Sequence, residues 1–167
     1  MRKYHILIAA AVVVLDRITK WLIAQKITLH DSVDIIPGMF RLTHVQNQGA
    51  AFGLFADSPS EWKVAMLILF SIAALGVVSA LLWKNGNAMN ATAIALSLVM
   101  GGAVGNLWDR VAAGRVIDFL DFYLGSHHWP AFNIADSAIV VGALLLLTEI
   151  FLTTPQEEKA EEKVVSQ

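Results

Sequence analysis

Two acidic residues stand among apolar neighbours, where a charged side chain is costly. Asp118 lies inside the run 116–120 (VIDFL), and Asp136 leads directly into the apolar run 138–147. A charge in such a setting is tolerated when it is paired, hydrated or functional. Two carboxylates held together at low dielectric do not both ionise cheaply, so one keeps a proton while the other is a base. Such a pair can activate water against a peptide carbonyl, so the pattern predicts an aspartate dyad with hydrolytic chemistry.

Other kinds of site lack their usual residues. The chain has no cysteine, which excludes disulfides, thiolate metal sites and a cysteine nucleophile. No serine stands in a G-x-S-x-G pattern, and the histidines show neither H-x-x-x-H nor H-E-x-x-H spacing. The neighbours His127 and His128 would point to opposite sides of an extended chain. We therefore expect no metal and no cofactor. Asp121 is a weaker candidate than Asp118 because its neighbours place it toward an exposed loop.

The composition is that of a membrane protein. Of the 167 residues, 56% are hydrophobic and 16% are charged, whereas soluble domains carry roughly 25% charged residues. The net charge of −2 argues against a nucleic-acid partner.

Four stretches are long and apolar enough to predict membrane-spanning helices, at about 4–24, 59–83, 91–108 and 134–152. Asn90 is the expected N-cap of the third. The first could instead be a cleaved signal peptide, but no small-residue cleavage site ends its apolar run, so we expect a retained helix. We assign 1–155 to one integral membrane domain and predict a polar, disordered cytoplasmic tail over 156–167.

Four crossings place both termini on one side of the membrane. Basic residues are divided evenly between the two sides, so the positive-inside rule hardly distinguishes the two orientations. Only the pair Arg2 and Lys3, beside the first span, favours cytoplasmic termini. The two aspartates then lie toward the outer face. The connection 28–57 is too long for a turn, and residues 40–43 alternate apolar and polar. This pattern predicts a small β-element on the outer surface, with an unstructured loop as the alternative.

Further polar residues fall within the predicted spans. Asp16 and Lys20 are four residues apart and can pair on one helix face, bracing a site. Asn106 and Arg110 share a stripe near the end of the third span, where both need partners, although Arg110 could instead reach lipid headgroups. Asn133 precedes Asp136 by three residues and could cap the fourth helix.

Small residues indicate close approaches of the backbone. Gly101 and Gly105 are spaced to let another helix pack closely against the third span. Asn47 and Gly49 read, from spacing alone, as an ordinary turn.

The motifs match a known family. The chain resembles the lipoprotein signal peptidases (signal peptidase II) in five blocks that occur in order, namely 15–20 (LDRITK), 47–52 (NQGAAF), 101–110 (GGAVGNLWDR), 116–119 (VIDF) and 132–137 (FNIADS). The family motif usually reads Asn-Thr-Gly where this chain has Asn47-Gln48-Gly49, which leaves the amide and the glycine in place.

The resemblance implies an all-α membrane protein with four transmembrane helices and a small β-cradle on the outer, periplasmic face. It implies an intramembrane aspartyl endopeptidase of the bacterial cytoplasmic (inner) membrane, inhibited by globomycin-type peptides. We expect the protein to be a monomer. The enzyme would cut prolipoproteins just before the diacylglyceryl-modified cysteine. By similarity Asp118 and Asp136 are the catalytic pair, and the residues that bind substrate or support the site are Asn47, Gly49, Asn106, Arg110, Asn133, Asp16 and Lys20.

Two alternatives remain from the residues alone. A proton-coupled transporter or channel subunit could use the carboxylates as relays, but it would favour an acid near the middle of the bilayer. A structural four-helix membrane protein could use the polar residues only to hold its helices together.

Overall fold

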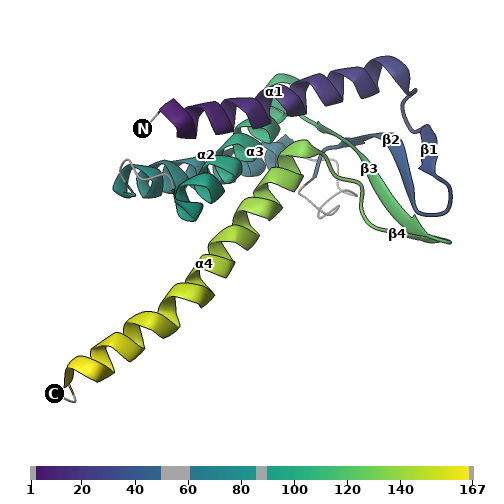
Figure 1. Ribbon diagram of the computed structural model, residues 1–167. Helices are drawn as coiled ribbons and strands as arrows, with labels where there is room; N and C mark the ends of the chain where they lie inside the picture. Colours follow the sequence, from purple (N-terminus) through teal and green to yellow (C-terminus); the bar gives the residue numbers. More distant parts are fainter. Residues whose placement is uncertain (1–2, 50–60, 86–89, 166–167) are drawn as a thin grey trace.

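The computed structural model describes residues 3–49, 61–85 and 90–165 of the chain. Long helices form most of it, and a small sheet lies at one end of the helical part (Figure 1). The helices are α1 (Lys3–Lys26), α2 (Glu61–Lys84), α3 (Ala91–Ala113) and α4 (Ile134–Val165), and the strands are β1 (Ser32–Ile36), β2 (Phe40–Asn47), β3 (Val116–Leu124) and β4 (His127–His128).

Three helical segments are long and apolar enough to cross a membrane: Trp62–Lys84, Ala91–Ala113 and Ile134–Phe151. They correspond to the second, third and fourth predicted spans, of which residues 59 and 60 lie outside the described part. The first predicted span forms α1, but its charged residues, Asp16 among them, lower its hydropathy.

The fourth helix is longer than the sequence predicts. We expected it to end near residue 152 and a disordered tail to follow, whereas α4 continues to Val165. The physical reason is the composition of the tail, which is rich in Glu and Lys, both strong helix formers.

Helix α3 is central, because it contacts α1, α2 and α4. Asn90 caps its start as predicted, with its side chain accepting from the amide N of Ala93. The glycines permit the close approach. A Cβ added to Gly101 would lie 2.7 Å from the carbonyl oxygen of Ala9 in α1, and one added to Gly105 would lie 2.9 Å from a carboxylate oxygen of Asp16.

The four strands form an antiparallel sheet in the order β1-β2-β3-β4. Strands β1 and β2 confirm the predicted β-element, although residues 50–57 of its range lie outside the described part. Strand β3 (Val116–Leu124) is a correction, since we expected an exposed loop around Asp121. Its partner β2 is distant in sequence, with Val45 opposite Asp118, and the long-range pairing supplies the backbone hydrogen bonds that make this segment a strand.

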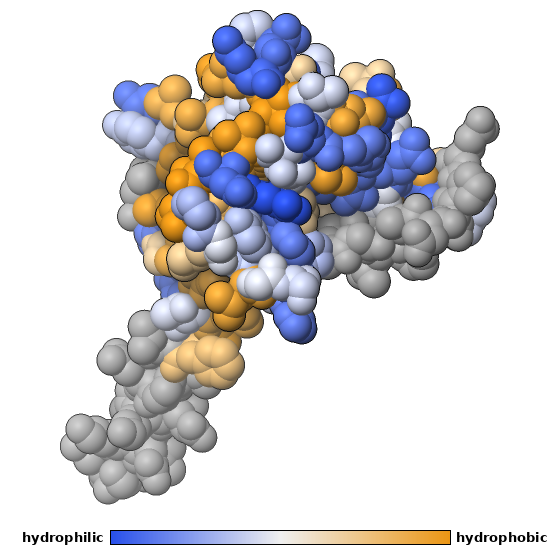
Figure 2. Space-filling model, turned by 90° about the vertical axis from the view of Figure 1, so that its right-hand side faces the viewer, coloured by the Kyte–Doolittle hydropathy of each residue, from blue (hydrophilic) through white to orange (hydrophobic). Residues whose placement is uncertain are grey.

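The end of α1 packs on the sheet. Ile23 and Ile27 form a small apolar core with Phe119 of β3, which ties the strand to the helices. Seen toward the sheet end, the surface mixes polar and apolar residues (Figure 2). By contrast, large apolar side chains such as Phe70 and Phe151 are exposed on α2 and α4, as expected of helices that face lipid.

Candidate active site

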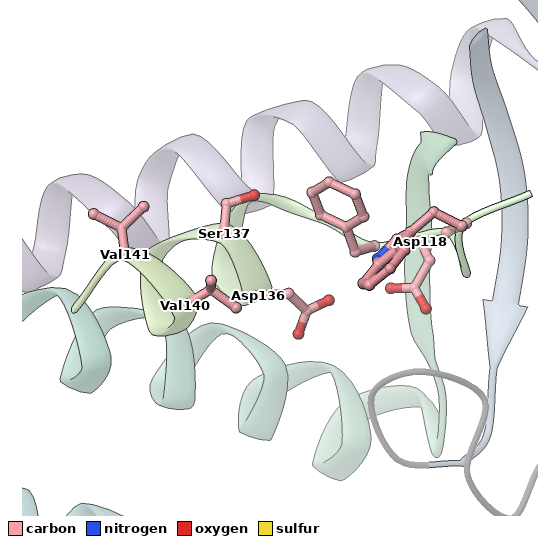
Figure 3. A pocket seen from close by; sticks show the side chains of 8 residues that line it. Asp118, Asp136, Ser137, Val140 and Val141 are labelled. Atoms are coloured by element: carbon pink, nitrogen blue, oxygen red, sulfur yellow. The ribbon is translucent and has the colours of Figure 1, made fainter. Parts of the chain in front are cut away.

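The two predicted aspartates converge from different elements. Asp118 is carried by β3 and is buried, with 4% of its surface exposed, and Asp136 lies in the first turn of α4 and is partly exposed. Figure 3 shows both carboxylates pointing toward the same space. They also line one cavity, of about 320 Å³. The fold therefore joins the two acids that the sequence singled out.

Two asparagines hold Asp118 from both sides. Asn133 Nδ2 donates to Asp118 Oδ1 at 2.7 Å, and Asn47 Nδ2 donates to Asp118 Oδ2 at 2.9 Å. The Asn47 side chain is fixed in turn, because its Oδ1 accepts from the amide N of Gly49 at 2.7 Å. The turn predicted at Asn47 therefore also positions a donor for the catalytic candidate.

Asp136 is held in a similar way. Asn106 Nδ2 donates to Asp136 Oδ1 at 2.7 Å, and the backbone N–H of Asn133 donates to Asp136 Oδ2 at 3.2 Å. Asn133 also caps α4, since its Oδ1 accepts from the Asp136 amide N at 3.0 Å, so the N-cap interpretation is confirmed. Every oxygen of the two carboxylates thus accepts one amide N–H, and Asn133 bonds to both acids.

The environment of Asp118 favours its protonated form. Burial, followed by the nearby charge of Asp136, raises the pKa of Asp118 to about 6 from 3.8, against the opposing effect of hydrogen bonds from Asn47 and Asn133. Loss of hydration destabilises the carboxylate, and a neighbouring acid adds repulsion. A proton can therefore be retained by the pair near neutral pH, which is the condition for one acid and one base to act together.

A buried ion cluster stands behind the dyad. The predicted pair is present, with Lys20 Nζ donating to Asp16 Oδ2 at 2.7 Å, and Lys20 also reaches Asp109 Oδ2 at 2.7 Å. Asp16 Oδ1 accepts from the amide N of Ala135 in α4 at 3.0 Å. Sequence reasoning left Asp109 unassigned. Asp109 lies three residues after Asn106, one helical turn away, and pairs with Arg17 and Lys20 of α1. This helical spacing from Asn106 is the signal that could have identified it.

Arg110 lies at the edge of the site. Its guanidinium donates to the backbone oxygens of Asn106 and Gly49, each at 3.4 Å. It therefore contacts the site backbone, and in the part of the chain that the structure describes it links α3 to the turn after β2.

Three cavities meet at the aspartates. The one between them is lined by apolar residues that the sequence reading did not identify, Trp129, Phe132, Val140 and Val141, with Ser137 beside them. A second, of about 230 Å³, runs from Asp118 along the end of β2. A third, of about 290 Å³, extends from Asp136 between α2, α3 and α4. An apolar chain and an extended peptide segment can thus both reach the carboxylates.

Asp121 differs from its prediction. It is buried, with 4% of its surface exposed, rather than part of an exposed loop. Arg41 Nε donates to its Oδ2 at 2.6 Å, and His128 Nδ1 lies 3.1 Å from its Oδ1. Residues 118 and 121 are an odd number of positions apart on the strand, so their side chains lie on opposite faces. Asp121 therefore belongs to the sheet and not to the dyad.

Comparisons with known proteins point to one family. The family model described as signal peptidase (SPase) II matches residues 8–152. A lipoprotein signal peptidase of Solibacter usitatus is 45% identical over 143 residues, covering 86% of this chain and 87% of the relative. One of Geobacter sulfurreducens is 46% identical over 137 residues, covering 82% and 84%. A bacterial membrane enzyme solved by the in meso method superposes with a TM-score of 0.81 at 33% identity, covering 90% of this chain and 89% of the other. The chain belongs to the signal peptidase II family.

Proposed function

We propose that this protein is a lipoprotein signal peptidase in which Asp118 and Asp136 form the catalytic dyad. Removal of the signal peptide from prolipoproteins follows from the family and from relatives that carry this activity as their name. The observation that supports the dyad is that both carboxylates line one cavity and bond to the same residue, Asn133. Family membership also favours the peptidase over the transporter and the structural alternatives.

The dyad acts on water and on the scissile peptide. The ionised carboxylate takes a proton from a water molecule as its oxygen attacks the peptide carbonyl. The protonated carboxyl donates its proton to the developing oxyanion. When the C–N bond breaks, the carboxyl that took the water proton passes it to the leaving nitrogen, and the tetrahedral hydroxyl returns its proton to the other carboxylate. The asparagine donors hold both acids in place throughout, so little reorganisation is needed when charge develops.

The substrate is the lipid-modified precursor, cut just before its diacylglyceryl-cysteine. The cavities at Asp136 have walls of apolar side chains, which suits a signal peptide and acyl chains that arrive from the bilayer. Globomycin-type peptides would occupy the same space and inhibit. We expect a monomer, because the site is built from one chain.

The enzyme lies in the bacterial inner membrane with four crossings and both termini in the cytoplasm. The support for α1 as the fourth crossing is that Asp16 and Lys20 face inward and are buried, whereas Leu15, Ile18 and Trp21 are exposed. Charges paired inside a helical bundle do not prevent it from spanning lipid. The sheet and the dyad then lie at the outer face.

Substitution of each acid tests the dyad. Asp118→Asn and Asp136→Asn should each abolish prolipoprotein processing in proteoliposomes while the protein still inserts and unfolds cooperatively. Asp121→Asn is the matched control, since it changes an equally buried acid of the same strand outside the dyad, and it should retain processing. Cleavage at the wild-type rate by either dyad variant would rule out this assignment.

A further inference from the structure

Within the described residues, the ammonium group of Lys20 donates its hydrogen bonds to groups beside the dyad and not to the dyad carboxylates. Its Nζ donates to Asp16 Oδ2 at 2.7 Å, to Asp109 Oδ2 at 2.7 Å and to Asn106 Oδ1 at 3.1 Å. Three oxygens match the three N–H donors of an ammonium group. The side chain is 2% exposed, so its position is set by these contacts.

The third contact dictates how the Asn106 amide is oriented. An ammonium group donates and cannot accept, so the atom of Asn106 that faces it must be the carbonyl oxygen. The NH₂ group is thereby turned to the other side, where it donates to Asp136 Oδ1 at 2.7 Å. Asn133 Nδ2, 3.4 Å from the same Asn106 oxygen, supports this orientation.

We infer that Lys20 is a positioning residue for the proposed peptidase reaction, which holds the Asn106 amide so that its NH₂ faces Asp136. The inference rests on the proposed dyad. Without the lysine, the Asn106 amide can rotate and present its oxygen to Asp136. The Asn106 oxygen would then accept a hydrogen bond from the protonated form of Asp136, and the N–H donor that stabilises the ionised form would be lost.

Several charged groups surround this relay and must be considered in any pH measurement. They are Asp16, Arg17 and Lys20 of α1, Asp109 and Arg110 of α3, Asp118 of β3 and Asp136 of α4. Loss of Lys20 alone would therefore change the field at the dyad as well as the orientation of Asn106. The experiment has to separate these two effects.

The separating variant is Lys20→Met/Asp16→Asn. It removes one positive and one negative charge together, keeps the Arg17–Asp109 ion pair, and leaves an oxygen on residue 16 for the Ala135 N–H. Removing a buried pair as a unit avoids leaving an unpaired buried charge. Arg17→Gln is the matched control, because Arg17 also bonds to Asp109 but is 47% exposed, whereas the contact with Asn106 is made by Lys20.

The measurement is kcat, KM and the pH profile of cleavage of a diacylglyceryl-modified prolipoprotein by the full chain in proteoliposomes, with melting temperature in parallel. We expect Lys20→Met and the double variant to lose kcat, on the order of 10²-fold for a misplaced catalytic group, with KM near the wild-type value. The acid limb of the profile should move to higher pH in both. Arg17→Gln should keep the kcat and the acid limb of the wild type.

Each other outcome overturns the positioning role. Wild-type kcat in the double variant would mean that Lys20 only neutralises Asp16. Loss of kcat with an unchanged acid limb would mean that Asn106 is not reoriented, and failure of both variants to fold would assign Lys20 to assembly of α1 and α3. Asp118→Asn is measured in the same assay, so that a failed dyad, seen as retained cleavage, is distinguished from a failed role of Lys20.

Discussion

At the scale of single residues, the site is a set of asparagine amides whose orientation is imposed by their neighbours. The oxygen of Asn47 accepts from Gly49, that of Asn133 from Asp136 and that of Asn106 from Lys20. Each amide nitrogen is therefore turned to a carboxylate. Neutral amide donors hold the two carboxylates in place. A positively charged side chain bonded to each carboxylate would instead keep both acids ionised.

Asn133 combines a cap with a donor, and substitutions can separate the two. Asn133→Ala should lose about 1 kcal/mol of stability with the cap and on the order of 10²-fold in kcat/KM with the donor. Asn133→Ser keeps an oxygen for the Asp136 N–H, so its melting temperature should stay near that of the wild type while cleavage falls as in the alanine variant. Full activity of the serine variant would show that the donation to Asp118 is dispensable.

The raised pKa of Asp118 makes stability depend on pH. The folded protein binds this proton more tightly than the unfolded chain, with a pKa of about 6 against 3.8. The stabilisation is complete below the lower value and is lost as pH rises through the higher one, with an upper size of about 3 kcal/mol. The melting temperature should therefore fall between pH 4 and pH 7 in the manner of a single titration.

The variant Asp118→Asn removes the titrating group and should flatten this part of the profile. Asp31→Asn, which changes an exposed carboxylate outside the site, should keep the wild-type slope. An equally steep profile in Asp118→Asn would assign the pH dependence to other groups.

At the scale of elements, α3 is the helix on which the site depends, because it carries Asn106, Asp109 and Arg110 and packs on the other three helices. Close packing by glycine brings its polar residues within hydrogen-bond reach of α1 and α4. A larger side chain at Gly101 or Gly105 would push α3 away from α1 and would act on the helix packing first, not directly on the two aspartates.

Alanine substitution of two glycines should have opposite effects. In Gly101→Ala the new methyl would meet the backbone of Ala9 and the Cβ of Val12 at 2.7 Å, so we expect a loss of about 1–3 kcal/mol from overpacking. In Gly76→Ala of α2 the methyl meets nothing within 4 Å, so we expect a gain of about 0.5–1 kcal/mol from helix propensity. Thermal unfolding in one detergent tests the pair, and equal effects would contradict the packing of α1 on α3.

At the scale of the whole molecule, polarity is inverted relative to a soluble protein. Acids, lysine and amides are buried between α1, α3 and α4, whereas leucine, phenylalanine and tryptophan side chains are exposed along the helices. This distribution suits a protein whose solvent is lipid. It also explains why α1 falls below the hydropathy of the other three helices although its exposed face is apolar.

The proposed orientation can be tested with cysteine reporters, since the chain has no cysteine of its own. Val33→Cys places a thiol on the exposed edge strand β1, and Lys84→Cys places one at the far end of α2. In spheroplasts a membrane-impermeant maleimide should label the first directly and the second only after permeabilisation. The reverse pattern would place the sheet and the dyad in the cytoplasm.

The membrane class, the long apolar helices and the candidate acids and amides of the site could all be predicted from the sequence. These follow from local properties: hydropathy over about 20 residues, a capping residue such as Asn90, and charges such as Asp16 and Lys20 at helical spacing. The segment that carries Asp118 could not be assigned in this way, because β3 becomes a strand by pairing with β2, far away in the chain. For the same reason Asp121 was predicted in an exposed loop, whereas it is buried in β3.

Which polar groups contact one another became visible only in the folded protein. That Asn133 bonds to both acids, that Lys20 reaches Asn106 and Asp109, and that three cavities converge on the carboxylates depend on how α1, α3 and α4 cross. Hydropathy and residue spacing indicate whether a segment forms a helix and whether it can cross the membrane. The side chains that share a hydrogen bond are set by packing between segments, because a contact of about 3 Å depends on the relative placement of two helices.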